Sequence, residues 1–541
     1  MIEVRESTDL DVTGIRDLFI AAYGKNYTYP AYYDLHVLKK MVFDDDTLLL
    51  VAVETDTGQI LGTASVIFDL GEYGDLVGEF GRLVVHPEGR HKGIGKKLME
   101  KRLEVASQRL HVGFVENRVA HPFSQKISAR FGFAPAGFLP LKARFDERES
   151  LALYVRHFGD AITLRRNNPR LIPECFELAQ YVLSSCGLEA DAIIDDSSKP
   201  YPDEKEFELE EMKTKGYASL IRFERSRSDK KEIFGPARIH QGIFRLTATH
   251  SHYVIARKNG ALVGAVGFSI DMVEKAVKIF ELVTLNEMPN RVLVEEVMRI
   301  CREKYEMAYI EVDVSAYSPR MQRTLLELQF VPVAYIPAFA FKGSERCDVV
   351  RMARLFRPAE LDAAVRYKKT EPIFEIVKNS FAAGDIFPEL AEALPGIRLF
   401  KRLSIEQARR LMEICEVKSF EKGQTVVETG MAGENAFVIL SGEFEVKAGM
   451  NDRVRSLGKI LKGECFGETA ILTTEDHSVC AIASEKTEAA VINSDDLDLL
   501  IRRRPDIGVV LYRNLARSLG RKLRSVDADI ASTLFGEDHQ E

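Results

Sequence analysis

The sequence predicts a multidomain α+β protein in which two related mixed-sheet α/β modules precede an antiparallel β-barrel of jelly-roll type with flanking helices. The length of 541 residues exceeds what one hydrophobic core usually holds and suggests roughly three or four domains. An alternation of strand and helix patterns occurs twice, and short strands separated by glycines follow near the C-terminus. The expected domains are 1–150, 151–240, 241–357, 358–394 and 395–541. The second is a helical and polar insertion, and the fourth is a helical connector.

The composition is that of a globular chain without an overall basic field. Hydrophobic residues make up 46%, charged residues 29%, and the formal net charge is −8, so nucleic acid is not expected as a partner. The seven cysteines contain no C-x-x-C pair, which argues against a disulfide framework or a metal site. No signal-peptide pattern and no apolar run of ~20 residues is visible. We therefore expect a cytoplasmic protein without a membrane segment.

Residues 1–145 have the pattern of an α/β unit. The patterns predict, in order, a strand at 1–7, a helix at 9–23, a β-hairpin at 48–70, a strand at 79–85, a helix at 93–108, a strand at 111–119 and a helix at 122–131. Thr57-Gly58 supplies the hairpin turn. One face of the helix expected at 93–108 carries apolar residues, as a helix that packs on a sheet requires, namely Ile94, Leu98, Met99, Leu103 and Ala106.

The same order of elements returns between residues 245 and 345. A hairpin with Asn259-Gly260 at its turn is followed by KIFELVTL, which matches the strand EFGRLVV, and then by strand, helix and strand patterns. Three landmark pairs are each 197 residues apart, namely Gln125 and Gln322, Phe133 and Phe330, and Pro140 and Pro337. A constant offset over three landmarks indicates an internal duplication.

A glycine-rich loop, Arg90-His91-Lys92-Gly93-Ile94-Gly95, joins the strand at 79–85 to the next helix. Backbone N–H groups at a helix N-terminus, together with the helix dipole, attract a pyrophosphate. The two glycines let the backbone approach that anion closely. A purely structural turn is the alternative, because glycine-rich turns between strands and helices are common.

The wider pattern resembles the GNAT acyltransferase superfamily over residues 1–145. The elements that carry the resemblance are Val85-His86-Pro87, the glycine-rich loop, and Gly132-Phe133. The resemblance implies a mixed sheet splayed between its fourth and fifth strands, with acetyl-CoA or another acyl-CoA in the cleft as co-substrate. The implied cofactor-binding residues are Leu83, Val84, Val85, Arg90, His91, Lys92, Gly93, Ile94, Gly95 and Lys96.

Two side chains are candidates for proton transfer. Attack on a thioester requires a neutral amine, so a carboxylate can serve as general base. Glu79 matches the position of the catalytic glutamate in lysine acetyltransferases of the superfamily, and an exposed strand glutamate is the alternative. The tyrosine that the family often uses as general acid is replaced by Ser128. Water or His121 can substitute for it, although a lone histidine is more often structural.

The corresponding loop in the repeat, Leu285–Asn290, has no glycine pair and carries Glu287 where an anion would bind. We therefore expect the second module to have lost its CoA loop and to keep a structural or substrate-positioning role. A weak or altered CoA site is the alternative.

The segment from residue 395 onward resembles cyclic nucleotide-binding domains. Its glycine spacing and Phe466-Gly467-Glu468 carry the resemblance. The family implies that helix N–H groups after this motif, from Thr469 on, meet the cyclic phosphate and that Glu468 accepts a ribose hydroxyl. An arginine that pairs with the phosphate is replaced by His477, followed by Ser478. Because histidine is mostly neutral at pH 7, we expect binding of cAMP or cGMP to be weak, pH-dependent, altered in specificity or lost. A purely structural or protein-docking barrel is the alternative.

These features together predict an acetyl-CoA-dependent N-acetyltransferase, acting on protein lysines, under allosteric control by the C-terminal domain. Two alternatives stay open: a non-catalytic sensor or scaffold for acyl-CoA and cyclic nucleotide, and an acetyltransferase for small-molecule amines. The acidic end after the last long helix is too short for a DNA-binding motif. The arginine-rich stretch at 502–524 is either the solvated face of an amphipathic helix or part of a homodimer interface.

Overall fold

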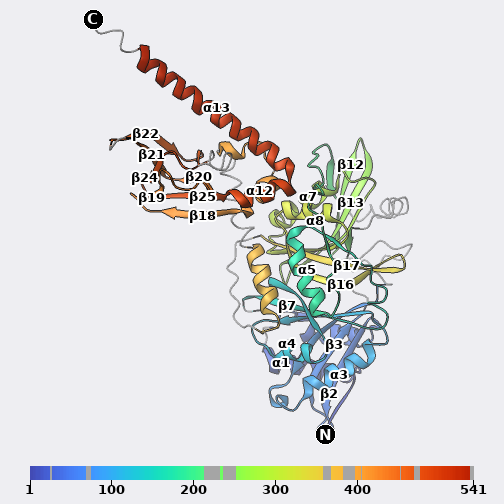
Figure 1. The fold of residues 1–541 in the computed structure, drawn as a ribbon. Helices are drawn as coiled ribbons and strands as arrows, with labels where there is room; N and C mark the ends of the chain where they lie inside the picture. Colours follow the sequence, from blue (N-terminus) through green and yellow to red (C-terminus); the bar gives the residue numbers. More distant parts are fainter. Residues whose placement is uncertain are drawn as a thin grey trace. The chain divides into compact units, whose positions relative to one another are not determined.

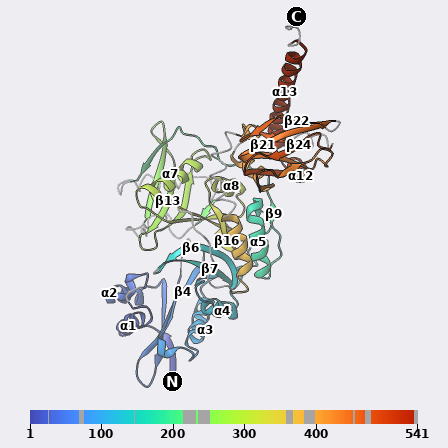
Figure 2. The same cartoon turned by 90° about the vertical axis from the view of Figure 1, so that its left-hand side faces the viewer.

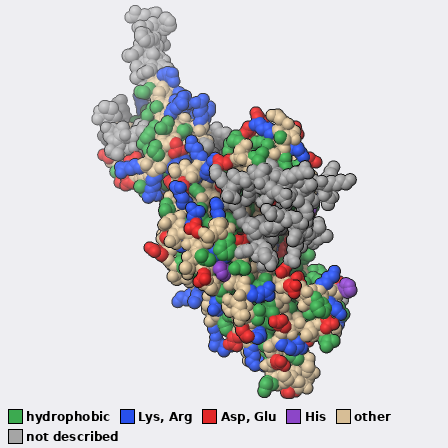
Figure 3. Space-filling model, turned by 90° about the vertical axis from the view of Figure 1, so that its right-hand side faces the viewer, with side chains coloured by type: hydrophobic (Ala, Val, Ile, Leu, Met, Phe, Trp, Pro, Cys, Tyr) green, Lys and Arg blue, Asp and Glu red, His purple; other side chains and the backbone are tan. Residues whose placement is uncertain are grey.

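The chain forms two compact units, Met1–Phe381 and Ala382–Glu541 (Figure 1). The computed structural model describes residues 1–24, 27–68, 75–145, 147–212, 232–234, 251–356, 367–381, 397–403, 405–450, 453–467 and 476–535. Among the helices in these stretches, none is long and apolar enough to cross a membrane. On the face shown in Figure 3, Lys and Arg side chains are interspersed with Asp and Glu.

A mixed sheet of 15 strands runs through the first unit. Its first half consists of β1 (Ile2–Glu6), β2 (Thr47–Glu54), β3 (Ile60–Ile67), β4 (Val77–Val85), β5 (Val112–Arg118), β6 (Ala134–Arg144) and β7 (Arg148–His157). Its second half consists of β10 (Glu208–Glu211), β11 (Ile233–Phe234), β12 (Ser251–Lys258), β13 (Ala261–Asp271), β14 (Ala276–Thr284), β15 (Tyr309–Ser315), β16 (Val331–Lys342) and β17 (Glu345–Leu355). The spatial order is β1-β2-β3-β4-β5-β7-β6-β16-β17-β15-β14-β13-β12-β10, with β11 paired to β15.

Helices cover both faces of the first half, as Figure 2 shows. They are α1 (Val12–Tyr23), the short η1 (Pro30–Tyr33) and α2 (Leu35–Val42) on one face, and α3 (Ile94–Ala106) and α4 (Phe123–Arg130) on the other. Strand β2 contributes side chains to the cores on both faces of the sheet, because successive side chains of a strand point to opposite faces. Leu48 and Leu50 belong to the core beneath α3, whereas Leu49 and Val51 belong to the core beneath α1.

Strands β4 and β5 pair in parallel only at their beginnings. The pairing covers Val77–Glu79 and Val112–Phe114, after which the two strands separate. Strands β14 and β15 behave in the same way, with pairing only between Ala276–Ile279 and Tyr309–Val312. Each half of the sheet therefore contains one splay between a central pair of parallel strands.

The duplication is visible in the strand positions. Strands β5 and β15, β6 and β16, and β7 and β17 each begin 197 residues apart. The backbone repeats an unusual feature at the same offset, because Leu141 and Ala338 have positive φ angles of 49° and 51°. Non-glycine residues rarely adopt such angles. The helices α7 (Asn290–Glu303) and α8 (Pro319–Glu327) correspond to α3 and α4.

The two halves join edge to edge through β6 and β16, where Gly137 pairs with Ala334. Helix α5 (Pro173–Ser185) packs on both of these strands, and β8 (Arg170–Leu171) pairs with β9 (Ile193–Ile194). Strand β7 crosses residue 150, at which the sequence suggested a domain boundary. Within the predicted connector, residues 371–381 are helical; 358–366 and 382–394 lie outside the described residues.

The second unit contains two antiparallel sheets of four strands, in the orders β18-β25-β20-β23 and β19-β24-β21-β22. The strands are β18 (Cys415–Phe420), β19 (Thr425–Val427), β20 (Asn435–Ser441), β21 (Glu443–Met450), β22 (Arg453–Leu461), β23 (Cys465–Phe466), β24 (Cys480–Ala483) and β25 (Thr487–Asn493). The helical elements among the described residues of this unit are η4 (Arg398–Phe400), α10 (Ile405–Glu413), α12 (Ser494–Arg503) and α13 (Pro505–Phe535). Phe420, Phe437, Phe444 and Phe466 share one apolar core. The predicted fold class, mixed-sheet modules followed by an antiparallel β-domain, is confirmed.

Candidate functional site

The glycine-rich loop lies between β4 and the N-terminus of α3. The short helix η2 (Pro87–Gly89) leads into the loop, and Gly93 is the N-cap of α3 with φ of 73°. Glycine adopts this left-handed conformation without the strain that a Cβ atom would bring. Because Gly93 has no side chain to cap the helix, the first N–H groups of α3 can receive an anion.

The predicted cofactor residues differ in exposure. Ile94 is only 1% exposed and belongs to the core, so only its backbone can serve the loop. Gly95 lies beside α4, since a Cβ there would be 3.3 Å from Ile127 Cδ1. Arg90, His91, Lys92, Gly93 and Lys96 are exposed, Leu83 and Val85 are half-buried, and Val84 is buried.

A cavity of ≈ 400 Å³ lies where β4 and β5 separate. It brings Glu79, His121, Leu83 and Val84 to one place, together with Ser128. Val85 and residues 90–96 are not part of its lining. Strand β4 therefore connects the two features, because its residues from Glu79 to Val84 line the cavity and the loop follows its end at Val85.

Glu79 forms an ion pair with Arg82, whose Nη1 lies 2.7 Å from Glu79 Oε1. Arg82 has a positive φ of 51° at an irregularity in the pairing of β3 with β4. Burial lowers the pKa of the Arg82 guanidinium, but Glu79 and the nearby tyrosines raise it above its usual value overall. Arg82 therefore remains charged and fixes one carboxylate oxygen of Glu79.

His121 has a buried Nδ1 atom with no hydrogen-bond partner in the described part of the chain. Burial, followed by the charge of Arg118, lowers the pKa of the imidazole. The neutral ring can therefore accept a proton, or form a hydrogen bond with a ligand, at an atom that no described protein group occupies.

Further polar atoms at the cavity are also unsatisfied. The Ser128 hydroxyl donates to Asn117 Oδ1 at 3.2 Å. Asn117 Nδ2 and Ser124 Oγ are buried and without partners among the described residues, and both residues line the cavity. Buried polar atoms are normally hydrogen-bonded, so these atoms indicate a place for a polar ligand.

Arg102 also lines the cavity, although its place in the sequence did not mark it as a site residue. It is 1% exposed, and its Nη1 donates to the carbonyls of Ser65 and Gly81 at 3.3 and 3.2 Å. Within the described chain no carboxylate pairs with it, and burial lowers its pKa to about 9. The pattern did contain a signal, because Arg102 occupies the apolar stripe of α3 between Leu98 and Ala106.

In the second half, the loop that corresponds to the glycine-rich loop makes side-chain contacts at the start of α7. Asn290 Oδ1 accepts from Thr284 Oγ1 at 2.8 Å. Glu287 forms an ion pair with Arg320, which places a carboxylate near the start of α7. These contacts occupy the region where the first half has its glycine pair.

In the second unit, Phe466 stacks on Phe437 with 4.7 Å between ring centroids. A Cβ atom on Gly467 would lie 2.6 Å from the Asn435 carbonyl and 3.4 Å from His477 Cε1. His477 is 9% exposed, and burial lowers the pKa of its imidazole, so the ring is neutral at pH 7. Ser478 is exposed. Glu468 and Thr469 lie outside the described residues.

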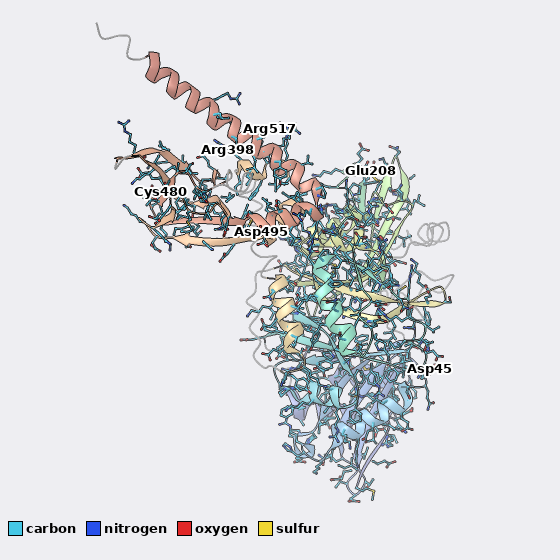
Figure 4. All side chains as sticks on the ribbon, in the orientation of Figure 1. Asp45, Glu208, Arg398, Cys480, Asp495 and Arg517 are labelled. Atoms are coloured by element: carbon cyan, nitrogen blue, oxygen red, sulfur yellow. The ribbon has the colours of Figure 1, made fainter. Side chains whose placement is uncertain are left out.

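The same unit has a basic groove between η4 and α13. Arg398 and Arg517, both labelled in Figure 4, line it from these two elements. Arg398 also pairs with Glu464 at 3.0 Å. The arginine-rich face of α13 is thus in part a wall of this groove.

Two family models match the chain. Residues 12–133 match the acetyltransferase (GNAT) family, and residues 417–504 match the cyclic nucleotide-binding domain. The chain therefore joins a GNAT acetyltransferase domain to a cyclic nucleotide-binding domain. The second half of the large sheet is consistent with a second GNAT-like module.

Individual relatives cover part of the chain. The cyclic AMP receptor protein of Thermus thermophilus is 28% identical over 145 residues, which are 27% of this chain and 65% of that protein. The cGMP-dependent protein kinase of Eimeria tenella is 32% identical over 129 residues, 24% of this chain and 12% of the kinase. The solved catabolite activator protein of Thermus thermophilus aligns at 27% identity with a TM-score of 0.24, covering 26% of this chain and 63% of that chain. This chain covers less than two thirds of each of these proteins.

Proposed function

We propose that the GNAT domain transfers the acetyl group of acetyl-CoA to the side-chain amine of protein lysines, under control of the cyclic nucleotide-binding domain. The observation that carries the proposal is that strand β4, which separates from β5, connects two candidate sites. The uncapped N-terminus of α3 can bind the pyrophosphate, and the cavity between β4 and β5 contains Glu79.

In this reaction the amine nitrogen attacks the thioester carbonyl, the new C–N bond forms, and the C–S bond breaks with CoA leaving as a thiolate. Glu79 accepts the proton of the incoming ammonium, directly or through water. The thiolate needs little protonation, so the replacement of the family's tyrosine by Ser128 is compatible with turnover. Water can supply that proton, or His121 can after its unpartnered Nδ1 has taken up the proton that the attacking amine releases once the C–N bond has formed.

Control by cAMP or cGMP is the second part of the proposal. Fusion of a catalytic and a nucleotide-binding domain supports it by analogy. Coupling requires that the nucleotide bind two states of the protein with different affinity. The neutral, buried His477 offers no permanent charge to a cyclic phosphate, so we expect weak nucleotide binding.

One observation favours a non-catalytic sensor of acyl-CoA instead. The carboxylate of Glu79 is already engaged by Arg82 at 2.7 Å, and Ser128 is engaged with Asn117. A protein that binds acetyl-CoA and transfers nothing would have this arrangement.

Release of free CoA thiol separates the two functions. The full-length protein would be incubated with acetyl-CoA and Nα-acetyl-lysine methylamide, with and without cAMP or cGMP. Acetylated product in step with thiol release supports the enzyme. Acetyl-CoA binding without product from this acceptor or from lysine-containing proteins supports the sensor.

A further inference from the structure

The cavity of the GNAT domain is not built by that domain alone. Part of its lining comes from the end of β13, the turn to β14, β14 itself and β15, all in the second half of the sheet. These residues are Ser269, Asp271, Glu274, Ala276, Val277, Lys278, Tyr309 and Glu311. A module whose own loop is closed by Glu287 and Arg320 thus contributes to the site of its neighbour.

Most of the charges around the cavity are paired. Glu79 pairs with Arg82 at 2.7 Å, Glu116 with Lys142 at 2.8 Å, and Glu311 with Lys142 at 3.2 Å. Among the described residues that line the cavity, two carboxylates have no ion-pair partner. They are Asp271 and Glu274, and both belong to the second half.

Glu274 is firmly positioned. It is 8% exposed, its Oε2 accepts from the backbone N–H of Arg144 at 2.6 Å, and it is hydrogen-bonded to Tyr29. Asp271 holds the turn by accepting from the N–H groups of Val273 and Glu274, both at 2.9 Å. A buried carboxylate without an ion-pair partner is costly. Burial raises the pKa of Glu274, and the charge of Lys142 offsets this only in part.

Two residues, Tyr29 and Arg82, connect Glu274 to Glu79, the proposed general base. Tyr29 contacts Glu274, and its ring centroid lies 6.0 Å from the guanidinium of Arg82, which holds Glu79. Tyr23 and Tyr27 also line the cavity, with 5.0 Å between their ring centroids. Aromatic faces next to a carboxylate favour an alkyl chain that ends in a positive charge.

We infer that the second half of the sheet supplies the acceptor subsite of the GNAT domain, in which Glu274 binds the ammonium of a lysine side chain whose alkyl part lies against Tyr27 and Tyr29. Asp271 supports it by fixing the turn and adding negative charge. The inference rests on the proposed function for the position of the acyl donor. It assigns the second module a role in recognising the acceptor.

The test uses Nα-acetyl-lysine methylamide as probe and its norleucine counterpart, which lacks the charge. Binding to the full-length protein saturated with CoA is measured by saturation-transfer NMR. We expect the wild type to bind the lysine probe at least about tenfold more tightly than the norleucine probe. Glu274→Gln, and more so Glu274→Gln with Asp271→Asn, should remove this preference. Glu345→Gln, an exposed glutamate of the second half, is the control and should keep it.

Acetyl-CoA affinity within twofold of wild type shows that each variant is folded and that its donor site is intact. If both variants keep the preference for the lysine probe, or if the wild type has none, the inference is wrong. If the preference depends on Glu274 but no acetyl group is transferred, the acceptor subsite stands and the proposed function fails. If transfer occurs and Glu274→Gln leaves the KM for the lysine probe unchanged, the proposed function stands and the subsite fails.

Discussion

Gly137 of β6 and Ala334 of β16 face each other where the two halves of the large sheet join. A Cβ atom at position 137 would lie 2.2 Å from the Cβ of Ala334 and 2.7 Å from the carbonyl oxygen of Val333. A Cβ atom does not pack at these distances from carbon or carbonyl oxygen, so the junction requires glycine at this position.

Gly137→Ala should therefore destabilise the first unit. Because the overlap involves backbone as well as a methyl group, we expect a loss of about 1–3 kcal/mol in the free energy of unfolding, measured by urea denaturation. Ala334→Gly in the same chain should recover part of the loss, since it removes only one of the clashing atoms. Unchanged stability of Gly137→Ala would contradict the edge-to-edge junction.

Glu79→Gln removes the proposed general base while keeping the size of the side chain. We expect kcat for Nα-acetyl-lysine methylamide to fall by about 10²–10⁴, with the acetyl-CoA affinity unchanged. Glu88→Gln makes the same change at an exposed position in η2 and should have no effect. Wild-type kcat in Glu79→Gln would exclude this residue as the base.

His157 links β7 to β16 by donating from Nε2 to the Pro337 carbonyl at 2.8 Å. Burial lowers its pKa to about 4, compared with about 6.5 in the unfolded chain. The unfolded chain thus binds the proton first as the pH falls. The contribution of neutral His157 to the free energy of unfolding is therefore fully present above pH ~6.5 and is lost as the pH falls toward ~4. The loss between pH 7.5 and 5.5 is about 1.4 kcal/mol.

His157→Gln keeps a donor for Pro337 but does not titrate. The free energy of unfolding is measured for this variant and the wild type at pH 7.5 and 5.5. Between these two pH values the wild type should lose about 1.4 kcal/mol more than His157→Gln. Parallel pH profiles for the two proteins would show that His157 is not buried in its neutral form.

His477→Arg should strengthen nucleotide binding. Arginine has a permanent charge and a two-pronged donor for the cyclic phosphate, so the Kd for cAMP should fall by about tenfold or more. Ser478→Arg places the same charge at the adjacent exposed position, and its affinity for cAMP should increase less than that of His477→Arg. If calorimetry shows equal affinity for both variants and the wild type, the barrel does not bind the phosphate near residue 477.

Much of the fold follows from local patterns. The offset of 197 residues that relates the landmark pairs in the sequence also separates the first residues of equivalent strands in the structure. It is visible in the sequence because nearby residues specify the turns and helix ends that bound these strands. The union of the two halves into one sheet was not predictable. It depends on the contact of Gly137 with Ala334, and such a contact leaves no periodic signal in either strand.

Only part of the candidate site was predictable from the sequence. The glycine-rich loop is a continuous motif, so its position at the start of α3 was expected, and Glu79 was placed in the cleft by resemblance. Glu274 lies in an ordinary turn, and only the folding of the second half against the first brings it to the same cavity. Arg102 was overlooked because a basic residue in an amphipathic helix usually faces solvent.

Isothermal titration of the full-length protein with acetyl-CoA tests the central claim most directly. Gly93 and Gly58 have nearly the same positive φ, 73° and 71°, and open space around the Cβ position, so changing either to alanine strains the backbone equally. We predict one acetyl-CoA per chain, affinity at least about tenfold weaker in Gly93→Ala, and affinity unchanged in Gly58→Ala. Absence of binding, or equal weakening by both variants, would contradict a donor site at the start of α3.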